Sequence, residues 1–425
     1  RVSRAFVQPG ALSGVAAVPE SKSAAHRALL CAGLSDGESV LSPLGGSADI
    51  RATERVLKAL GARLSPGVGK ALRVKGPLKA PPGSCDLFCG ESGSTLRFLI
   101  PIAAALGASA VFSGEGRLPK RPLETYLDLL PSHGVSCESK GGLPLSISGH
   151  LTPGTFALPG DISSQFITGL LFALPLLKAD SDIILTTPLQ SAGYVEMTRA
   201  IQKAFGVESV QTPRGFHVPG RQRYTPRAYE IEGDWSQAAF FLCAGAILQN
   251  GVAVSNLQKD STQGDRAIFP ILQKFGAAVS WEDGLCVSRP GALSAMEIDV
   301  GQIPDLLPIL AVTAAYANGR THLKNAARVR LKESDRVHAM CEGLRALGID
   351  AEEEPDGLWI TGGPLHGGAV NGYNDHRIVM AFAVAALGAS GPVTISDAQA
   401  IDKSWPAFFD DYNALGGNAH VILGQ

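Results

Sequence analysis

Apolar and polar positions alternate along this chain in a pattern that repeats six times. Each repeat opens with a small polar or acidic stretch and continues in an apolar run long enough for a buried helix. The six repeats open at positions 21, 90, 160, 233, 303 and 374, which gives a period of about 70 residues. We therefore expect six copies of one structural unit.

A second, more amphipathic run follows each apolar run and usually stops at a glycine, which is typical of a helix C-terminus. These glycines stand at positions 61, 134, 206, 276, 348 and 416. Short runs typical of β-strands, such as DIILTT and PVTISD, lie between the helical runs. The repeat is therefore predicted as strand–helix–strand–helix–strand, with the first helix buried and the second on the outside.

At 425 residues the chain is too long for one compact core, so we expect two domains of three repeats each. Buried helices that pack side by side bring their N-terminal ends to one end of a domain. These ends carry unpaired N–H groups and a partial positive charge, which suit anions. Two such domains facing each other would form an anion-binding cleft.

Composition narrows the classes of function. The net charge is −2, so no general positive field recruits nucleic acid or an acidic membrane. The longest apolar runs, such as FITGLLFALPLL, are too short to span a bilayer, and RVSRAFVQPG lacks the core of a signal peptide. Of seven scattered cysteines only Cys85 and Cys89 lie close in sequence, without partners for a zinc site. We expect a cytoplasmic protein.

Polar and charged residues gather at the helix starts. The first start carries Lys22, Ser23 and Arg27. These side chains could simply cap a solvated end, but a lysine there opposes the helix dipole unless an anion lies between. The second start, around Gly93, has small residues that let a ligand approach the backbone. The third has neutral donors and acceptors suited to hydroxyls or phosphate oxygens, at Ser163, Ser164 and Gln165.

Later repeats add acidic and basic groups. Asp305 interrupts the apolar IPDLLP, where it could be an N-cap or a base. Arg377 opens the sixth buried helix, where a cation needs a counter-ion. Arg121 and Lys403 lie in polar loops. The segment RLKESDRV, residues 330–337, could be a solvated helix start or one wall of an anion site.

Taken together, SKSAAHRALL, ESGSTLRF, KRPLE, GDISSQF, IPDLLP, LKESDR, NDHR and DKSWPAFF resemble the motifs of the enolpyruvyl transferases, in family order and over essentially the whole chain. GDISSQF and LKESDR fit the members that act on shikimate 3-phosphate. The resemblance implies a two-domain inside-out α/β barrel, with six βαβαβ-type repeats, three per domain. It places residues 19–229 in one domain, 1–18 plus 230–425 in the other, and the active site in the cleft between them.

The implied reaction transfers the enolpyruvyl group of phosphoenolpyruvate to the 5-hydroxyl of shikimate 3-phosphate and releases phosphate, in the shikimate pathway that leads to chorismate and the aromatic amino acids. The resemblance implies no cofactor and no metal. We expect a monomer with two small-molecule substrates and no nucleic acid or membrane partner.

The resemblance also assigns roles by position. The residues expected to bind shikimate 3-phosphate are Lys22, Ser23, Arg27, Ser163, Ser164, Gln165, Ser191, Tyr194, Asp305 and Lys332. Those expected to bind phosphoenolpyruvate are Lys22, Gly93, Arg121, Gln165, Arg336, Arg377 and Lys403. The catalytic residues are expected to be Asp305, Glu333 and Lys22, with no assignment of either carboxylate to a step.

Three positions depart from the family pattern, at Glu91, Ser94 and Arg328. Glu91 adds negative charge where asparagine is more frequent, which bears on the affinity for phosphoenolpyruvate and not on the reaction class.

Two alternatives stay open at this point. One is an enolpyruvyl transferase that acts on UDP-N-acetylglucosamine, but such enzymes commonly carry a cysteine in the loop that corresponds to SGEGRLPKR, which has none. The other is a non-catalytic repeat protein that binds anions. Replacing Glu333 with glutamine distinguishes an enzyme from a non-catalytic binding protein, because an enzyme should lose rate more than affinity.

Overall fold

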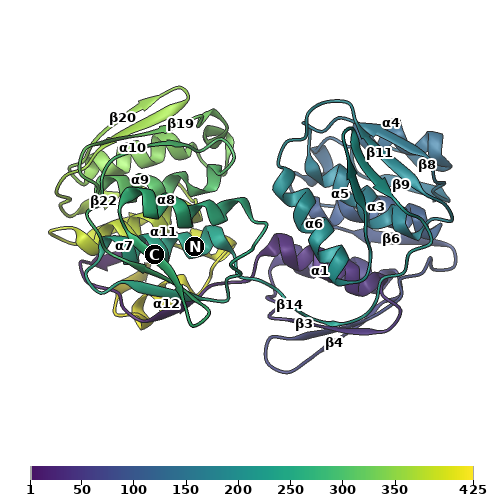
Figure 1. Ribbon diagram of the computed structural model, residues 1–425, viewed down its shortest axis with the longest axis horizontal. Helices are drawn as coiled ribbons and strands as arrows, with labels where there is room; N and C mark the ends of the chain where they lie inside the picture. Colours follow the sequence, from purple (N-terminus) through teal and green to yellow (C-terminus); the bar gives the residue numbers. More distant parts are fainter. Residues whose placement is uncertain (1, 425) are drawn as a thin grey trace. The chain divides into compact units, whose positions relative to one another are not determined.

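The computed structural model describes residues 2–424 of the chain (Figure 1). Contacts divide the chain into two compact units. One is continuous, Glu20–Glu232, and the other is made of two segments, Arg1–Pro19 and Gly233–Gln425. We call them the continuous unit and the two-segment unit. Each has its own hydrophobic core, and the two cores share no residue.

Each unit contains three four-stranded sheets of one pattern, in which a parallel pair of strands is extended by an antiparallel pair. The sheets of the continuous unit are β14 (Ala228–Glu230), β3 (Glu38–Ser42), β5 (Leu72–Lys75), β4 (Arg63–Pro66); β6 (Ser84–Phe88), β7 (Ser109–Ser113), β9 (Leu145–Gly149), β8 (Val135–Glu138); and β10 (Thr155–Leu158), β11 (Ser181–Leu185), β13 (Gly215–Val218), β12 (Val210–Thr212).

The two-segment unit repeats this arrangement. Its sheets are β16 (Ala278–Glu282), β17 (Leu285–Arg289), β15 (Val252–Ser255), β2 (Val15–Ala17); β18 (Glu297–Asp299), β19 (Arg320–Lys324), β21 (Gly357–Thr361), β20 (Asp350–Glu354); and β22 (Gly368–Val370), β23 (Val393–Ser396), β1 (Ser3–Gln8), β24 (Asn418–Leu423).

Three helices of each unit are buried nearly all round. They are α1 (Lys22–Leu34), α3 (Gly93–Leu106) and α5 (Ser164–Ala173) in the continuous unit, and α7 (Trp235–Ile247), α9 (Leu307–Ala315) and α11 (His376–Ala385) in the two-segment unit. All nine residues of α9 are buried, which matches its uniformly apolar sequence. The prediction that the first helix of each repeat is buried is confirmed.

The second helix of each repeat buries one face only. These outer helices are α2 (Ala48–Ala59), α4 (Glu124–Leu129), α6 (Ala192–Ala204), α8 (Ile268–Phe275), α10 (Arg336–Ala346) and α12 (Phe408–Ala414). α8 buries Ile268, Ile271, Leu272 and Phe275, the spacing of one helical stripe. All six glycines predicted to end these helical runs have positive φ.

Short 3₁₀ helices complete the connections. They are η1 (Leu118–Lys120), η2 (Leu130–His133), η3 (Leu174–Leu176), η4 (Gly264–Ala267), η5 (Pro304–Leu306), η6 (Ala327–Leu331), η7 (Ala386–Gly388) and η8 (Ala398–Lys403).

The observed repeat has one strand more than the sequence predicted. Its order is β-α-β-α-β-β in five of the six repeats, where the last two strands form an antiparallel hairpin such as β8–β9, and in the sixth β1 pairs with β24 in place of the hairpin. The first strand of that hairpin is short, with four residues in Val135–Glu138, so it gives only a weak pattern in the sequence.

Strands remote in sequence complete three of the sheets. β2 pairs in parallel with β15 of the two-segment unit, with Val15 opposite Ala253, and β14 pairs in parallel with β3, with Ala228 opposite Val40. β1 lies between β23 and β24. The chain therefore passes from one unit to the other twice, once before α1 and once before α7.

Candidate active site

The starts of the buried helices share one capping device. Five of the six begin with a side chain that accepts a hydrogen bond from a backbone N–H of the first turn: Ser21, Ser92, Ser163, Asp234 and Asp375. The first four of these residues stand 71 positions apart, at 21, 92, 163 and 234. The fifth buried helix, α9, follows η5 and has no capping side chain, and Asp305 lies in η5 rather than inside the helix.

Arg27 is a buried cation at the start of the continuous unit's first helix. Its Nε donates to Thr198 Oγ1 on α6 at 2.8 Å, and its Nη1 donates to the Ser23 carbonyl at 2.9 Å. Its guanidinium lies 5.1 Å from the ring centroid of Phe98 on α3 and 5.7 Å from that of Tyr194 on α6. Burial lowers the pKa of Arg27 to about 10, which still leaves it charged at neutral pH.

No carboxylate within the described residues forms an ion pair with Arg27, although only 3% of its surface is exposed. A buried charge without a counter-ion is costly. The neighbourhood of Arg27 is therefore suited to an anionic ligand.

Gln165 joins the starts of α3 and α5. Its Oε1 accepts from Arg97 Nη1 at 2.9 Å, and its Nε2 donates to Ser94 Oγ at 3.1 Å. Arg97 also donates to the Pro122 carbonyl at 3.1 Å and lies 4.7 Å from the ring centroid of Phe166. These contacts fix the orientation of the Gln165 amide.

Gly93 is the first residue of α3 and is buried against the Arg121 side chain. A Cβ atom at this position would lie 2.7 Å from Arg121 Nη1. Only glycine therefore leaves the exposed Arg121 guanidinium where it is. Arg121 itself follows η1 and its side chain emerges beside the start of α3.

The remaining residues assigned to this unit also lie at helix starts. Lys22 and Ser23 form the first turn of α1, and Ser164, buried, is the first residue of α5. Ser191 precedes α6 with a φ of 57°, and Tyr194 in the first turn of α6 is 45% exposed beside Arg27. The resemblance thus selects a set of side chains that gather at the starts of α1, α3, α5 and α6.

Arg336 organises the corresponding region of the two-segment unit. Its Nε and Nη2 donate to the two carboxylate oxygens of Asp375 at 2.8 and 3.2 Å. Its Nη1 donates to Asp305 Oδ1 at 2.9 Å, and its Nη2 donates to Glu333 Oε2 at 2.6 Å. Arg336 and Asp375 are fully buried, and one guanidinium donates hydrogen bonds to three carboxylates. The predicted role of Arg336 toward phosphoenolpyruvate stays a prediction.

Asp305 lies among three cations. Lys332 Nζ is 3.6 Å from Asp305 Oδ1, and Arg377 Nη2 is 3.8 Å from Asp305 Oδ2. Burial alone would raise the pKa of Asp305, but Arg377, Lys332 and Arg336 outweigh it and hold that pKa below its usual range. Asp305 is therefore an ionised carboxylate at neutral pH.

Arg377 is a buried cation at the start of α11. Its Nη2 donates to Ser236 Oγ on α7 at 2.9 Å. Its Nη1 is buried and has no hydrogen-bond partner within residues 2–424. Burial lowers the pKa of Arg377, but the nearby Asp305, Asp234 and Asp265 raise it above its usual value. Arg377 is thus a charged donor, and its Nη1 has no hydrogen-bond acceptor among the described residues.

Three groups near this cluster received no role from the sequence, although Asp375 stands in the NDHR motif. Asp234 and Asp375 were readable as helix caps, and as caps they orient Ser236 and Arg377, since Asp234 Oδ1 accepts from Ser236 Oγ at 2.6 Å and Asp375 Oδ1 accepts from the Arg377 N–H at 3.0 Å. Asp265 in η4 gave no signal. Burial and the neighbouring Asp305 raise the pKa of Asp265 to about 7.

The segment 330–337 divides between the two interpretations. Arg330 pairs with Asp335 at 2.9 Å and with Glu353 at 3.3 Å, and Asp335 caps α10 by accepting from the His338 N–H at 3.1 Å. Lys332 pairs instead with Asp305, and Arg336 pairs with Asp305, Glu333 and Asp375. Lys403, at the end of η8, donates to the Asn374 carbonyl just before α11.

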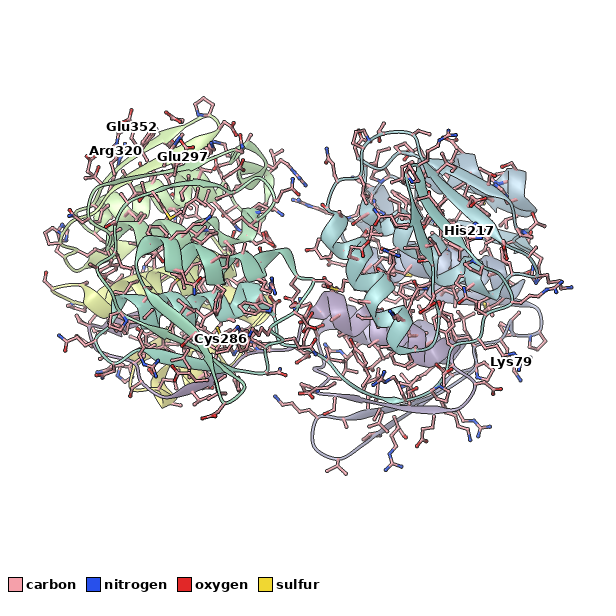
Figure 2. All side chains as sticks on the ribbon, in the orientation of Figure 1. Lys79, His217, Cys286, Glu297, Arg320 and Glu352 are labelled. Carbon is pink, nitrogen blue, oxygen red and sulfur yellow. The ribbon has the colours of Figure 1, made fainter. Side chains whose placement is uncertain are left out.

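Charged side chains elsewhere form ordinary exposed pairs. Arg320 and Glu352, labelled in Figure 2, are 3.0 Å apart, and their side chains are 50% and 65% exposed. Such pairs contribute little to stability. The buried clusters around Arg27 and Arg336 differ from this surface in burial and in the number of contacts per charge.

Comparison with known proteins gives the family. The sequence profile of EPSP synthase (3-phosphoshikimate 1-carboxyvinyltransferase) matches residues 7–412. The chain belongs to the EPSP synthase family. It is accordingly an enzyme, the transferase of the shikimate pathway that moves the enolpyruvyl group of phosphoenolpyruvate to shikimate 3-phosphate.

Full-length relatives agree with this family. The 3-phosphoshikimate 1-carboxyvinyltransferase of Clostridium novyi (strain NT) is 42% identical over 420 residues, which cover 96% of each chain. That of Clostridium perfringens (strain ATCC 13124) is 41% identical over the full length of both chains. A solved EPSP synthase from Acinetobacter baumannii superposes with a TM-score of 0.89 at 27% identity and covers 99% of this chain and 100% of that one. The predicted two-domain enolpyruvyl transferase fold is confirmed.

Proposed function

We propose that this chain performs the transfer with two groups of helix-start residues. The group in the continuous unit, around Arg27 and Gln165, holds shikimate 3-phosphate. The group in the two-segment unit contributes Arg336, Arg377 and Lys403 to the binding of phosphoenolpyruvate, and Asp305 and Glu333 to proton transfer. Residues assigned to phosphoenolpyruvate belong to both units, so the reaction requires the whole chain.

The observation that carries the proposal is the buried Nη1 of Arg377, which has no hydrogen-bond acceptor among the described residues. A charged guanidinium that is buried and keeps one donor without a partner needs an acceptor. The carboxylate or phosphate of phosphoenolpyruvate supplies one, with a charge-assisted hydrogen bond. The start of α11 adds its own N–H groups and partial positive charge on the same side.

Asp305 is the base for the attacking hydroxyl in this proposal. Its low pKa keeps it ionised, and its side chain is 29% exposed despite three cationic neighbours. The 5-hydroxyl oxygen forms a bond to C2 of phosphoenolpyruvate and gives its proton to Asp305, while C3 of phosphoenolpyruvate gains a proton. Lys332, 3.6 Å from Asp305, stabilises the carboxylate before it takes the proton.

The second half of the reaction eliminates phosphate. C3 of the intermediate, now a methyl group, loses a proton, the C2=C3 double bond forms again, and the bond from C2 to the phosphate oxygen breaks. We assign the proton transfers at C3 to Glu333, whose side chain is 45% exposed and is held by Arg336. Lys22 and Arg377 neutralise the departing phosphate.

The proposal includes no cofactor and no metal, and the described part of the chain holds no group of three or more His, Cys, Asp or Glu side chains placed for a metal ion. No helix of residues 2–424 is both long and apolar enough to cross a membrane. We propose a cytoplasmic monomer that binds neither membranes nor nucleic acid.

Phosphate release tests the proposed function. The protein is mixed with phosphoenolpyruvate and either shikimate 3-phosphate or UDP-N-acetylglucosamine, and free phosphate is followed over time. We expect release with shikimate 3-phosphate alone among the two acceptors. Release with the UDP-sugar instead would overturn the choice of acceptor. Release with neither acceptor would overturn the proposed transferase activity.

A further inference from the structure

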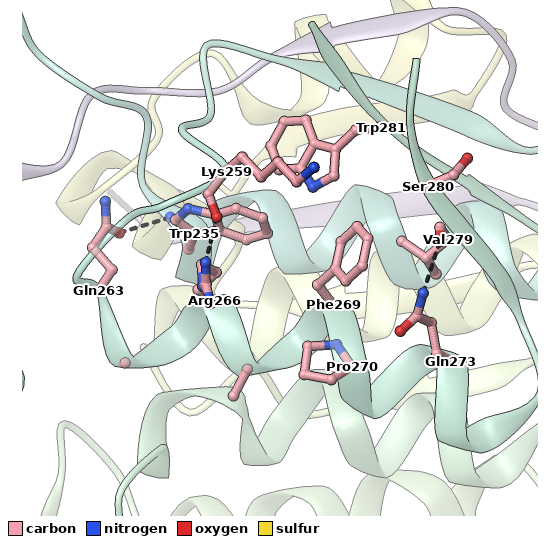
Figure 3. A pocket seen from close by; sticks show the side chains of 12 residues that line it. Trp235, Lys259, Gln263, Arg266, Phe269, Pro270, Gln273, Val279, Ser280 and Trp281 are labelled. Carbon is pink, nitrogen blue, oxygen red and sulfur yellow. Dashed lines mark hydrogen bonds between the residues drawn. The ribbon is translucent and has the colours of Figure 1, made fainter.

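A cavity of about 700 Å³ opens on the two-segment unit, outside the charged cluster (Figure 3). It is lined by η4, α8, β16, the loop before η4 and the first residue of α7. Its volume falls in the range of small-molecule sites, roughly 300–1,000 Å³. Nothing in the proposed reaction uses it.

Aromatic rings form the body of this cavity. The rings of Phe269 and Trp281 are nearly parallel, at 17°, with centroids 6.1 Å apart, and Trp235 meets Trp281 edge to face at 6.0 Å. Phe269 and Trp281 are half-buried, so part of each ring faces outward. Half-exposed rings in a concave site favour a flat aromatic ligand.

The polar groups of the lining are basic or neutral. Lys259 and Arg266 lie at one end in the view of Figure 3, and Gln273, Val279 and Ser280 lie at the other, with the rings between. Arg266 donates to the Lys259 backbone carbonyl, so the two basic residues are neighbours in the lining. None of the residues that line the cavity is acidic. This combination selects an anion attached to an aromatic ring.

Trp235 lines the cavity but offers it no accessible atom. It is 0% exposed, and its indole Nε1–H has no hydrogen-bond partner within the described residues. A ligand therefore reaches this N–H only if Trp235 moves, and an acceptor that reached it would offset the cost of the unpaired donor.

The cavity is also connected to the charged cluster by hydrogen bonds. Gln263, in its lining, accepts from the Trp235 backbone N–H at 2.9 Å and donates to the Gly233 carbonyl at 2.9 Å. Trp235 is followed by Ser236, whose hydroxyl accepts from Arg377 Nη2. A ligand that moves Trp235 or Gln263 therefore shifts the first turn of α7 and a partner of Arg377.

We propose that this cavity binds a small aromatic carboxylate, and that its occupation changes the affinity for phosphoenolpyruvate through Ser236 and Arg377. The binding step stands on the cavity alone, whereas the effect on affinity rests on the proposed function. The carboxylate lies at the Lys259–Arg266 end and the ring lies against Phe269 and Trp281.

Calorimetry with 2-naphthoate tests the binding step. We expect saturable binding at one site, with at least tenfold weaker binding of 2-naphthalenemethanol, which lacks the charge, and of cyclohexanecarboxylate, which lacks the aromatic ring. Lys259→Ala and Trp281→Ala should each weaken 2-naphthoate binding at least fivefold, and Lys274→Ala, an exposed change on α8 outside the cavity, should not. Lys259 is exposed, so its replacement leaves the fold intact. Absence of binding, or binding that Lys259→Ala leaves unchanged, would overturn the proposal.

Steady-state kinetics tests the connection to Arg377. Saturating 2-naphthoate should change the KM for phosphoenolpyruvate at least twofold in the unmodified protein, and Lys259→Ala should need at least fivefold more 2-naphthoate for the same change. Calorimetric binding without that change in KM would overturn the proposed effect on phosphoenolpyruvate affinity. The binding site itself would still stand. A protein without turnover would contradict the proposed function and leave the calorimetric result standing.

Discussion

At the scale of single residues, the charge of Arg336 is balanced inside the fold. Its guanidinium contacts Asp305, Glu333 and Asp375, and Asp375 is 0% exposed. Removing one partner of a buried ion pair leaves an uncompensated charge. Arg336 is therefore a structural residue as well as a candidate ligand contact.

Replacing Arg336 with methionine should lower the free energy of unfolding by about 3–5 kcal/mol, because Asp375 loses its counter-ion. All four tryptophans lie in the two-segment unit, so urea unfolding followed by tryptophan fluorescence reports on that unit. Arg320→Met, which removes an exposed pair with Glu352, should cost about 1 kcal/mol or less. Equal effects of the two substitutions, with loss of phosphoenolpyruvate binding only in Arg336→Met, would make Arg336 a ligand residue and not a structural one.

The raised pKa of Asp265 predicts a pH-dependent stability. This carboxyl has a folded-state pKa of about 7, above its usual value of 3.8, so the folded protein keeps a proton that the unfolded chain loses. Its contribution to stability is thus complete at low pH and is lost as the pH rises toward 7. Asp265→Asn cannot lose that proton, so its stability relative to the unmodified protein should rise by about 1–3 kcal/mol between pH 5 and pH 8.

Urea unfolding at both pH values measures this difference. Asp410→Asn, a change at an exposed position of α12, serves as the control and should show no such rise. A constant difference between Asp265→Asn and the unmodified protein at pH 5 and 8 would show that Asp265 is ionised throughout this range.

Sequence reasoning selected the residues that stand in characteristic motifs. It missed residues such as Asp265, whose charge lies close to these residues only in the folded chain. Lys332, Glu333 and Arg336 could be assigned because LKESDR is distinctive, and the structure brings all three to Asp305 or its neighbours. Asp265 lies 40 positions before Asp305, and only the packing of η4 brings their charges within reach. No local pattern encodes that approach.

At the scale of elements, the start of α3 depends on the absence of a side chain at Gly93. A Cβ atom there would lie 2.7 Å from Arg121 Nη1, and a flexible side chain such as arginine can move away. The fold should therefore tolerate alanine, while the position of the Arg121 guanidinium changes.

Gly93→Ala should raise the KM for phosphoenolpyruvate roughly tenfold, equivalent to about 1.4 kcal/mol, and should leave the melting temperature within about 2 °C of the unmodified protein. Steady-state kinetics and thermal unfolding check both parts. Gly363→Ala is the matched control, because its nearest neighbour, Ile349 Cδ1, is 4.0 Å from the added Cβ and its φ is not positive. An unchanged KM in Gly93→Ala would contradict the assignment of Arg121 to phosphoenolpyruvate binding.

Helices were easier to predict than strands for a physical reason. The buried helices are long and apolar, they start at a capping side chain in five of six cases, and the outer helices end at a glycine with positive φ. The extra strand of each repeat has only three to five residues in most sheets, and half of them are exposed. Its pairing comes from the hairpin and not from its own composition.

At the scale of the whole molecule, each unit has the parts of an independent domain. The core of the continuous unit contains only its own residues, and its three sheets are complete within Glu20–Glu232. A separate core and complete hydrogen bonding are the requirements for independent folding.

The fragment 20–232 should therefore fold alone, with a cooperative thermal transition by circular dichroism and dispersed amide signals by NMR. The fragment 20–226 lacks β14, which pairs with β3 from Ala228 to Glu230, and should melt at a lower temperature. A broad, non-cooperative transition of the longer fragment would mean that the continuous unit needs the rest of the chain to fold.

The repeat predicted six copies of one structural unit and a polar start for each buried helix, because a period of about 70 residues is visible in the sequence. The passages of the chain between units were not visible in the same way. β2 and β14 have three residues each, and their partners β15 and β3 are remote in sequence. For these passages the resemblance to the enolpyruvyl transferases supplied the expectation.

The mass spectrum of the product formed in D₂O tests the central claim most directly. Addition places a solvent-derived proton on C3 of phosphoenolpyruvate, and elimination then removes one of three methyl hydrogens. With shikimate 3-phosphate and phosphoenolpyruvate, we predict a product in which a carboxyvinyl group replaces the hydroxyl hydrogen, deuterium in its methylene group, and one phosphate released per product. No carboxyvinyl product, or a product without deuterium, would contradict transfer by addition and elimination on this chain.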